Sequence, residues 1–218
     1  MLSFLWDFLF PPHCPGCEAY VEKQGQWCSD CIEKMLQVHR LPVELEMQQL
    51  ITGGVWALGV YEEKLRDLIR NSKYNGKAHL LQGLHSFIEQ GLDQLKLQGD
   101  MAVPVPLYKD KLKQRGFNQS ERLFRQPFAN MKIPMAEALE RSRDTKPQYG
   151  LQARERQDNL KNAFQLNRSC DVQAVQGKEI ILVDDIMTTG ATLHFCSEAL
   201  QKAGAKKITA VVIASGRK

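Results

Sequence analysis

The feature that most constrains this chain is the segment at residues 180–193, near the C-terminal end. It opens with an apolar run, Ile180–Val183, whose composition is typical of a buried strand, and it continues into two adjacent carboxylates, Asp184 and Asp185. A small, hydroxyl-rich turn follows at Thr188–Thr192, and a helical pattern begins directly after it. The segment therefore predicts, in order, a strand, an acidic pair, a loop that fits a phosphate group, and a helix.

The polar part of this segment suits a phosphorylated sugar. Backbone N–H groups at the start of a helix point outward without partners, and the helix dipole favours negative charge there. The hydroxyls of Thr188, Thr189 and Thr192 add hydrogen-bond donors, and Gly190 lets the backbone approach an anion closely. Two carboxylates beside such a loop can hold sugar hydroxyls, either directly or through Mg²⁺. The combination fits a ribose 5-phosphate with a group leaving from C1.

The same string resembles the phosphoribosyl pyrophosphate (PRPP) binding motif of type I phosphoribosyltransferases. The resemblance implies that PRPP, together with Mg²⁺, is bound by Asp184, Asp185, Thr188, Thr189, Gly190, Ala191 and Thr192. The simpler alternative is a buried strand whose polar end precedes a helix cap, because Asp and Thr are common before helices. A lone Asp-Asp pair would favour that alternative, whereas the whole string favours the PRPP site.

Four of the six cysteines form two Cys-x-x-Cys pairs separated by a short loop: Cys14, Cys17, Cys28 and Cys31. This spacing matches the ligands of a structural zinc site, and Pro15-Gly16 in the first pair favours a tight turn. Disulfides or free thiols are the alternative, and a reducing cytoplasm makes disulfides the weaker one. A site with four sulfur ligands has no open coordination position. The Zn²⁺ is therefore expected to fold a small module rather than to catalyse a reaction.

The chain contains no segment long enough to span a bilayer. The apolar run Leu2–Phe10 is short, is interrupted by Asp7, and ends at Pro11-Pro12, so it does not match a signal peptide. A short amphipathic helix packed on the core is expected there instead. These features predict a cytoplasmic location.

Strand and helix patterns alternate along the remainder of the chain. Helices are expected at residues 32–39, 62–71, 77–95, 121–129 and 192–203, and strands at 55–60, 101–105, 162–166, 180–183 and 207–214. The alternation predicts an α/β fold with a mostly parallel sheet and helices on both faces. We expect a zinc module at residues 1–40, a linker at 41–52, and the α/β domain at 53–218.

Ligands of such folds bind beyond the carboxyl ends of the strands. The acidic pair and the Thr-Gly turn should therefore share one edge of the sheet with the loop that follows the strand at 101–105. That loop carries Lys109, Lys111 and Arg115, which are candidates to face a pyrophosphate group.

Positive charge is concentrated in one region, although the net charge of the chain is only +4. Residues 109–161 contain 13 Lys or Arg and 7 Asp or Glu, a local charge of +6. Phe117, Phe124, Phe128 and Tyr149 are interleaved with these charges and can stack on bases, but Phe124 and Phe128 have the helical spacing of core residues. The candidate contacts for single-stranded DNA are Lys113, Arg143, Lys146, Tyr149, Arg154 and Arg156. A solvated, charge-rich loop is the alternative.

Several segments together resemble the ComF family of competence proteins over nearly the whole chain. They are Phe10-Pro11-Pro12-x-Cys14 with the four cysteines, Lys73-Tyr74-Asn75-Gly76, Pro104-Val105-Pro106-Leu107, Arg115-Gly116-Phe117-Asn118-Gln119-Ser120, spaced residues between Arg143 and Phe164, and the Asp184–Thr192 motif. The resemblance implies a phosphoribosyltransferase-like fold with an N-terminal zinc module and an association with natural transformation, the uptake of single-stranded DNA by bacteria. The family carries no generally established reaction.

The resemblance also implies roles for individual residues. Asp184 and Asp185 would hold the ribose 2- and 3-hydroxyls, and Thr188–Thr192 would bind the 5-phosphate. Val105–Lys109 would face the pyrophosphate, and Arg143–Arg156 would form a mobile hood that excludes water from an activated sugar.

Three functions are consistent with the sequence. The first is a competence protein that handles incoming single-stranded DNA and binds PRPP as a ligand or regulator. The second is an active phosphoribosyltransferase that transfers ribose 5-phosphate from PRPP to a nucleobase or related acceptor. The third is a scaffold whose zinc module recruits a partner such as a DNA translocase or helicase of the competence machinery. We favour the first.

Overall fold

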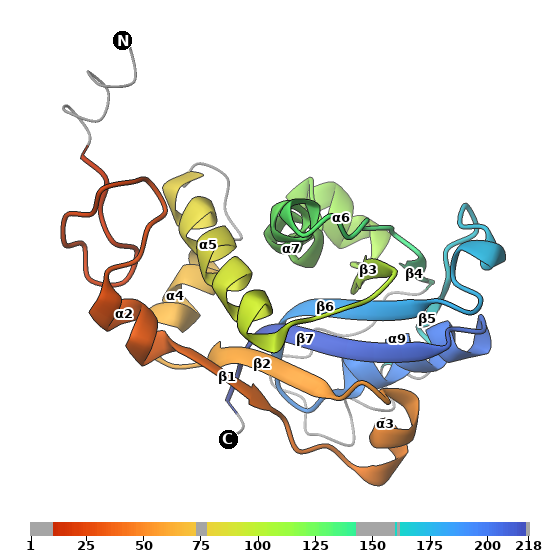
Figure 1. Ribbon diagram of the computed structural model, residues 1–218. Helices are drawn as coiled ribbons and strands as arrows, with labels where there is room; N and C mark the ends of the chain where they lie inside the picture. Colours follow the sequence, from red (N-terminus) through yellow and green to blue (C-terminus); the bar gives the residue numbers. More distant parts are fainter. Residues whose placement is uncertain (1–10, 73–77, 143–159, 161, 217–218) are drawn as a thin grey trace.

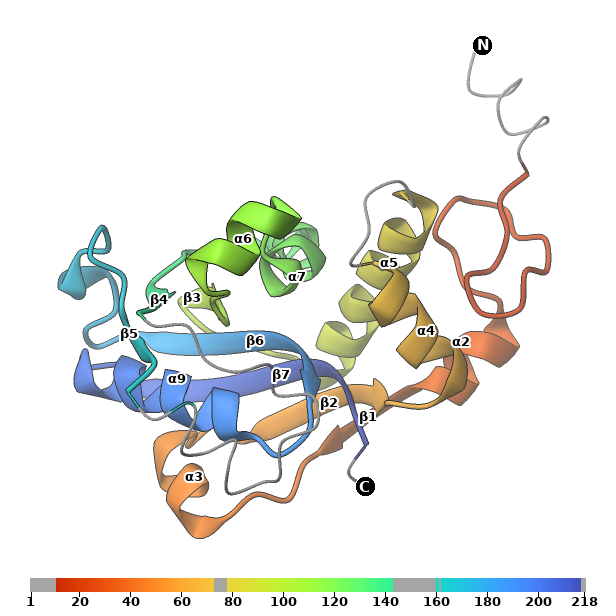
Figure 2. The same ribbon diagram turned by 180° about the vertical axis from the view of Figure 1, so that it is seen from behind.

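The computed structural model describes residues 11–72, 78–142, 160 and 162–216 (Figures 1 and 2). A five-stranded sheet has the order β1-β2-β7-β6-β3. In that order the strands span Leu36–Arg40, Val55–Val60, Lys207–Ser215, Glu179–Met187 and Met101–Pro104. Strand β1 pairs antiparallel with β2, and the other neighbours are parallel. The prediction of a mostly parallel sheet is confirmed.

Helices cover both faces of this sheet, as predicted (Figures 1 and 2). One face is covered by α4 (Glu63–Asn71), α5 (Ala78–Leu95) and α7 (Gln119–Asn130). The other face is covered by α9 (Ala191–Lys202) and α3 (Leu45–Leu50). Each face therefore has its own apolar core.

Strand β6 contributes to both cores. Ile180 and Leu182 pack in the core under α9, whereas Ile181 and Val183 pack in the core under α5 and α7. All four side chains are at most 1% exposed. A strand that is buried on both faces is apolar at every position, which explains the unbroken run in the sequence.

The same strand is longer than the sequence pattern predicted. The apolar run ends at Val183, but the parallel pairing with β7 continues as far as Met187, which lies opposite Ser215. The acidic pair therefore lies within the strand rather than after it. Backbone pairing across the sheet extends the strand through polar residues, which the local pattern does not reveal.

The segment between the cysteines and β2 also differs from the prediction. A helix, α2 (Ser29–Met35), ends four residues before the predicted boundary, and residues 36–40 form the edge strand β1. Residues 41–52, expected to form a linker, contain α3, and Met47 and Ile51 are buried in the core. Pairing of β1 with β2 and burial against α9 decide these structures, and neither is visible locally in the sequence.

The basic stretch after β3 is a helix and not a loop. Helix α6 (Lys109–Arg115) ends at Gly116, whose φ of 81° is left-handed and whose N–H bonds to the Leu112 carbonyl. The next helix, α7, begins at Gln119 because Asn118 caps it through a side-chain bond to the Ser120 N–H.

A two-stranded antiparallel sheet flanks the main sheet. It consists of β4 (Leu139–Arg141) and β5 (Phe164–Leu166), and its register places Leu139 opposite Leu166. A 3-10 turn, η1 (Val172–Ala174), follows β5. Within the described ranges, no helix has both the length and the apolar character needed to cross a lipid bilayer.

Candidate functional site

The acidic pair lies near the C-terminal end of strand β6, at the carboxyl edge of the parallel strands. Asp184 Oδ1 accepts hydrogen bonds from Ser120 Oγ and from the Asp185 N–H, each at 2.8 Å. Asp185 Oδ1 accepts from the Ile186 N–H, also at 2.8 Å. These contacts fix the orientation of both carboxyl groups relative to the end of the strand.

The Asp184 carboxyl holds its proton more tightly than an ordinary aspartic acid does. Burial, followed by the neighbouring charge of Asp185, raises the pKa of Asp184 from 3.8 to about 8, while the hydrogen bond from Ser120 acts in the opposite direction. A cation or a set of hydroxyl donors placed beside the pair would stabilise the charged form. The pair is therefore suited to bind Mg²⁺ or sugar hydroxyls.

The turn after β6 is shaped by Gly190. Its φ of 88° is left-handed, and a Cβ atom there would lie 3.1 Å from Met187 Cε and 3.3 Å from Met47 Sδ. The Thr189 hydroxyl accepts from the Ala191 N–H at 3.4 Å, where α9 begins. The left-handed backbone therefore favours glycine here, and a larger residue would also press against Met187 and Met47.

The structure brings most of the predicted PRPP residues to one small cavity of about 30 Å³. Its lining includes Asp184, Thr188, Thr189, Gly190, Ala191 and Thr192. Asp185 is not part of this lining. The carboxyl of one aspartate and the N-terminal turn of α9 thus line one small cavity.

A buried polar segment, which sequence reasoning treated only as a turn into a helix, supports the acidic pair. Asn118, Gln119 and Ser120 are each at most 7% exposed. The Asn118 amide donates to the Val105 carbonyl at 2.9 Å, and the Gln119 amide donates at 3.0 Å to the carbonyl of Ile69 at the end of α4. The signal in the sequence was three consecutive polar residues at a helix start, where one cap is sufficient.

The predicted pyrophosphate residues lie on α6. Lys109 lines a polar cavity of about 390 Å³ together with residues of the β4–β5 sheet, and its ammonium lies 6.0 Å from the centre of the Tyr108 ring. Lys111 and Arg115 line neither this cavity nor the one at Gly190, and Arg115 donates to Gln119 Oε1 at 3.4 Å. Of the three basic candidates, Lys109 is therefore the one that lines this polar cavity.

The candidate DNA contacts divide into two groups. Lys113 is exposed on α6. The other five candidates lie outside the described residues: Arg143, Lys146, Tyr149, Arg154 and Arg156, as does the predicted hood between Arg143 and Arg156. The apolar N-terminal run at residues 2–10 and the segment 73–77 also lie outside them. Phe124 and Phe128 are fully buried, which confirms their core role.

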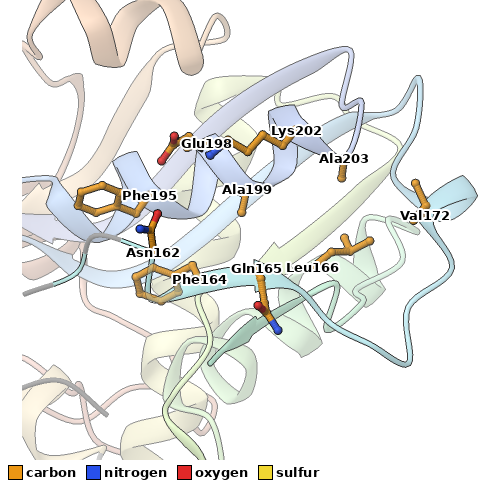
Figure 3. A pocket seen from close by; sticks show the side chains of 10 residues that line it. All are labelled: Asn162, Phe164, Gln165, Leu166, Val172, Phe195, Glu198, Ala199, Lys202 and Ala203. Carbon is orange, nitrogen blue, oxygen red and sulfur yellow. Dashed lines mark hydrogen bonds and ion pairs between the residues drawn. The ribbon is translucent and has the colours of Figure 1, made fainter. Parts of the chain in front are cut away.

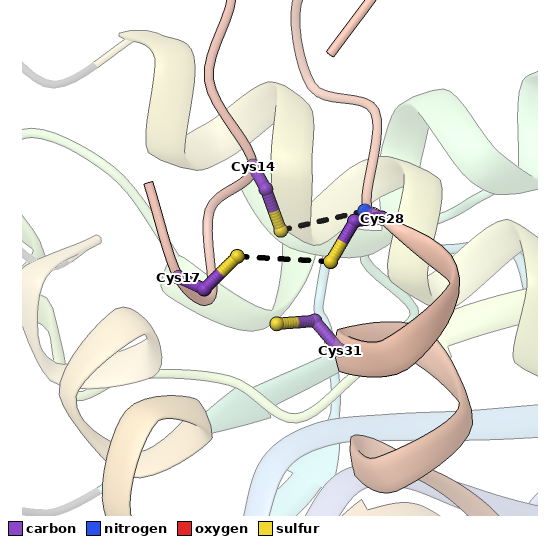
Figure 4. A group of neighbouring side chains, drawn as sticks. All are labelled: Cys14, Cys17, Cys28 and Cys31. Carbon is purple, nitrogen blue, oxygen red and sulfur yellow. Dashed lines mark hydrogen bonds between the residues drawn. The ribbon is translucent and has the colours of Figure 1, made fainter. Parts of the chain in front are cut away.

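The four cysteines converge as a metal site requires (Figure 4). Their sulfur atoms all lie within 4.8 Å of one another, and Cys17 Sγ is 3.6 Å from Cys28 Sγ. Four sulfurs around Zn²⁺ at about 2.3 Å are separated from one another by about 3.8 Å. The arrangement therefore fits a structural Zn²⁺ held by Cys14, Cys17, Cys28 and Cys31.

The cysteine module is packed firmly against α5. Trp27 Nε1 donates to the Gly83 carbonyl at 2.8 Å, and the Trp27 and Phe87 rings lie 5.6 Å apart. A Cβ atom at Gly83 would lie only 2.4 Å from Pro15 Cγ, so a larger residue would separate the two parts. The module is thus a fixed part of the molecule.

A further cavity of about 330 Å³ lies between β5 and α9 (Figure 3). Its lining is largely apolar, with Phe164, Leu166, Val172 and Phe195 from the two sides. Glu198 and Lys202 form an ion pair at 2.8 Å along its α9 wall. Among the residues that the structure describes, none of those predicted to bind PRPP, zinc or DNA lines this cavity.

Comparison with known families identifies two domains in the chain. Residues 5–42 match the double zinc ribbon domain, and residues 120–218 match the phosphoribosyl transferase domain. The first match contains the four cysteines, and the second contains both Ser120 and the acidic pair.

Full-length relatives agree with this assignment. The chain is 29% identical to competence protein F of Haemophilus influenzae, over 90% of this chain and 82% of that protein. It is 32% identical to the DNA utilization protein YhgH of Escherichia coli K12, over 89% and 80%, and 26% identical to competence protein ComFC of Streptococcus pneumoniae, over 89% and 84%. The chain therefore belongs to the ComF family of competence proteins, with a zinc ribbon followed by a phosphoribosyltransferase domain.

Proposed function

We propose that this competence protein binds PRPP at the carboxyl edge of the sheet and handles single-stranded DNA during natural transformation, in the cytoplasm. The single observation that carries the PRPP part is the cavity shared by Asp184 and the Gly190 turn. It combines an oriented carboxyl for hydroxyls or Mg²⁺ with the N-terminal turn of α9 for a phosphate.

Each part of PRPP has a candidate partner in this arrangement. Asp184 and Asp185 would hold Mg²⁺ and the ribose hydroxyls, and Thr188–Thr192 would bind the 5-phosphate. When bound, Mg²⁺ would neutralise charge on the pyrophosphate. The residues after β3 lie beside this site because the Val105 N–H bonds to the Val183 carbonyl at 2.9 Å, and Lys109 is the basic group nearest in sequence to that contact.

The DNA part is supported by charge and by the relatives. Helix α6 presents Lys109 and Lys113 to solvent, and the local charge of residues 109–161 is +6. Two relatives are named competence proteins, and a third is named a DNA utilization protein. A DNA translocase or helicase is the kind of partner that such a role would require.

Binding of an oligonucleotide at two salt concentrations tests the DNA part. We expect affinity at low salt that weakens steeply as salt rises, because lysine and arginine contacts to phosphates release counterions. Absence of binding at low salt, or binding that salt does not change, would contradict it. Thermal unfolding with increasing PRPP and Mg²⁺ tests the other part, since a ligand that binds only the folded state raises the Tm.

An active phosphoribosyltransferase is the second candidate function. The observation that favours it is the fixed orientation of the acidic pair, because electrostatic stabilisation of a reacting sugar requires groups that do not reorganise. Pyrophosphate release in the presence of PRPP, Mg²⁺ and a panel of nucleobases is the measurement. Release with no base of the panel would count against this candidate.

A further inference from the structure

A second cavity opens at the same edge of the sheet as the proposed PRPP site. It has a volume of about 380 Å³ and lies between the zinc module and the connection from β2 to α4. This volume falls in the range of about 300–1,000 Å³ that is typical of ligand sites. None of the residues of the proposed PRPP site lines it.

The two sites are neighbours along the ends of the parallel strands. Val60, which lines the second cavity, pairs with Ser215, and Ser215 pairs with Met187, which lines the cavity at Gly190. Adjacent strands lie about 4.8 Å apart, so the ends of β2 and β6 are separated by about 10 Å. A ligand longer than one nucleotide would reach from one site toward the other.

The walls of the second cavity are held by close packing. A Cβ atom at Gly59 would lie 2.6 Å from the Met35 carbonyl oxygen and 2.8 Å from Leu65 Cδ2. Met35 and Leu65 line the cavity from the module side and from the α4 side. Because β2 and the end of α2 can approach so closely only at a glycine, and because Trp27 anchors the module on α5, the cavity is pre-formed.

The lining of the cavity combines apolar side chains with two lysines. Met35 and Val60, both half-buried, supply the accessible apolar surface. Lys34 from the module and Lys64 from α4 are both exposed, and neither ammonium forms an ion pair within the described part of the chain. An apolar surface between two cations suits a flat ring that carries a negative group.

Negative charges nearby limit what this group can be. Glu62 lines the cavity, and so do Cys17 and Cys31. Four thiolates with one Zn²⁺ carry a net charge of −2. With Lys34 and Lys64 these groups leave a local charge of about −1, so a polyphosphate is strongly disfavoured. A unit with a single negative charge that contacts the two ammonium groups directly, such as one phosphodiester, is disfavoured least.

We infer that this cavity binds one nucleotide unit of single-stranded DNA, with the base on the apolar surface and the phosphodiester between Lys34 and Lys64. The inference rests on the proposed DNA function and adds a contact surface separate from α6. A strand bound here would extend along the carboxyl edge toward the Gly190 turn.

Fluorescence anisotropy with labelled oligo(dT) tests the inference on the full, zinc-loaded chain. In Lys34→Gln/Lys64→Gln we expect the Kd at low salt to rise about fivefold to tenfold, since each exposed charge contact contributes modestly. The slope of log Kd against log salt should fall by about 0.7, because the inferred site holds one phosphate and about 0.7 counterions are released per single-strand phosphate contact. Zinc content should stay unchanged, which shows that the module is intact.

The matched control is Lys178→Gln/Lys202→Gln, which removes the same charge at the opposite edge of the sheet and should bind within twofold of wild type. Equal Kd and equal salt slope for the two double variants would overturn the inference and leave the proposed function intact. Absence of oligo(dT) binding by the wild-type protein would overturn the DNA part of the proposed function, and this inference with it.

Discussion

Ser120 donates a 2.8 Å hydrogen bond to Asp184, although the two residues are 64 positions apart in the sequence. Ser120 belongs to the first turn of α7, and its neighbours Asn118 and Gln119 bond to the segment after β3 and to the end of α4. One short buried segment thus joins three elements around the carboxyl edge. The orientation of the acidic pair therefore depends on how α7 begins.

Substitution of Ser120 by alanine should weaken PRPP binding. Ser120 is 4% exposed, and the change removes its hydrogen bond to a carboxylate, a bond of a kind that contributes about 1.5 kcal/mol or more. We expect the Kd for PRPP with Mg²⁺ to rise about tenfold. Ser169→Ala, at an exposed serine, is the control, and an unchanged Kd in Ser120→Ala would contradict the positioning role.

Stability of the unliganded protein should depend on the pH through Asp184. Because its pKa is about 8 in the folded protein and has the ordinary value of 3.8 in the unfolded chain, the folded state holds the proton more tightly. The contribution of Asp184 to the free energy of unfolding should then be greatest below about pH 4. It should decline as the pH rises to about 8, because the unfolded chain loses this proton first.

Asp184→Asn should remove that decline. Between pH 5 and pH 8 the stability difference should shift in favour of the variant by up to about 4 kcal/mol, because each pH unit below the folded pKa of about 8 corresponds to about 1.4 kcal/mol. Denaturant unfolding at the two pH values, without ligand, measures it. A difference that is the same at both values would show that Asp184 is not a protonated, buried acid.

Gly83→Ala distinguishes the helix propensity of α5 from the packing of α5 against the zinc module, because the two effects change stability in opposite directions. In the interior of α5, alanine should stabilise the helix by about 1 kcal/mol. The structure predicts the opposite sign, because the new methyl group would lie 2.4 Å from Pro15 Cγ and force the zinc module away from α5. Thermal unfolding decides, with Gly216→Ala as the control, since nothing lies within 4 Å of a Cβ there. A higher Tm for Gly83→Ala would contradict the docking of the module.

Zinc removal should affect more than the module. We expect about one Zn²⁺ per chain, released by chelators and increasingly lost at low pH because the ligands must be thiolates. Loss of the metal should also lower the Tm of the α/β domain, because Trp27 and Phe87 pack together across the boundary. Metal analysis and thermal unfolding of Cys31→Ser provide the test, and an unchanged Tm would contradict this coupling.

The parts of the fold that the sequence predicts are those set by local composition. The apolar run at β6 and the glycine-led start of α9 are visible in the sequence because burial on both faces and a left-handed turn each require particular residue types. The zinc ligands are visible because two sulfurs must lie on each tight turn. These features depend only on neighbours in the chain.

The parts that were missed depend on distant partners. Strand β1 exists because β2 offers an open edge, and α3 is ordered by burial of Met47 beneath the Gly190 turn. The Ser120 contact to Asp184 spans the molecule, so no local pattern could assign it. One signal for helix α6 was present in the sequence, because a glycine after a run of basic residues, here Gly116, is typical of the end of a helix.

Calorimetric titration of the zinc-loaded protein with PRPP and Mg²⁺ tests the central claim most directly. The wild-type protein and a control, Asp67→Asn/Asp93→Asn, should show saturable binding, and Asp184→Asn/Asp185→Asn should lose it. Absence of binding by the folded wild-type protein, or equal binding by the Asp184→Asn/Asp185→Asn variant, would contradict the assignment of this edge of the sheet as a PRPP site.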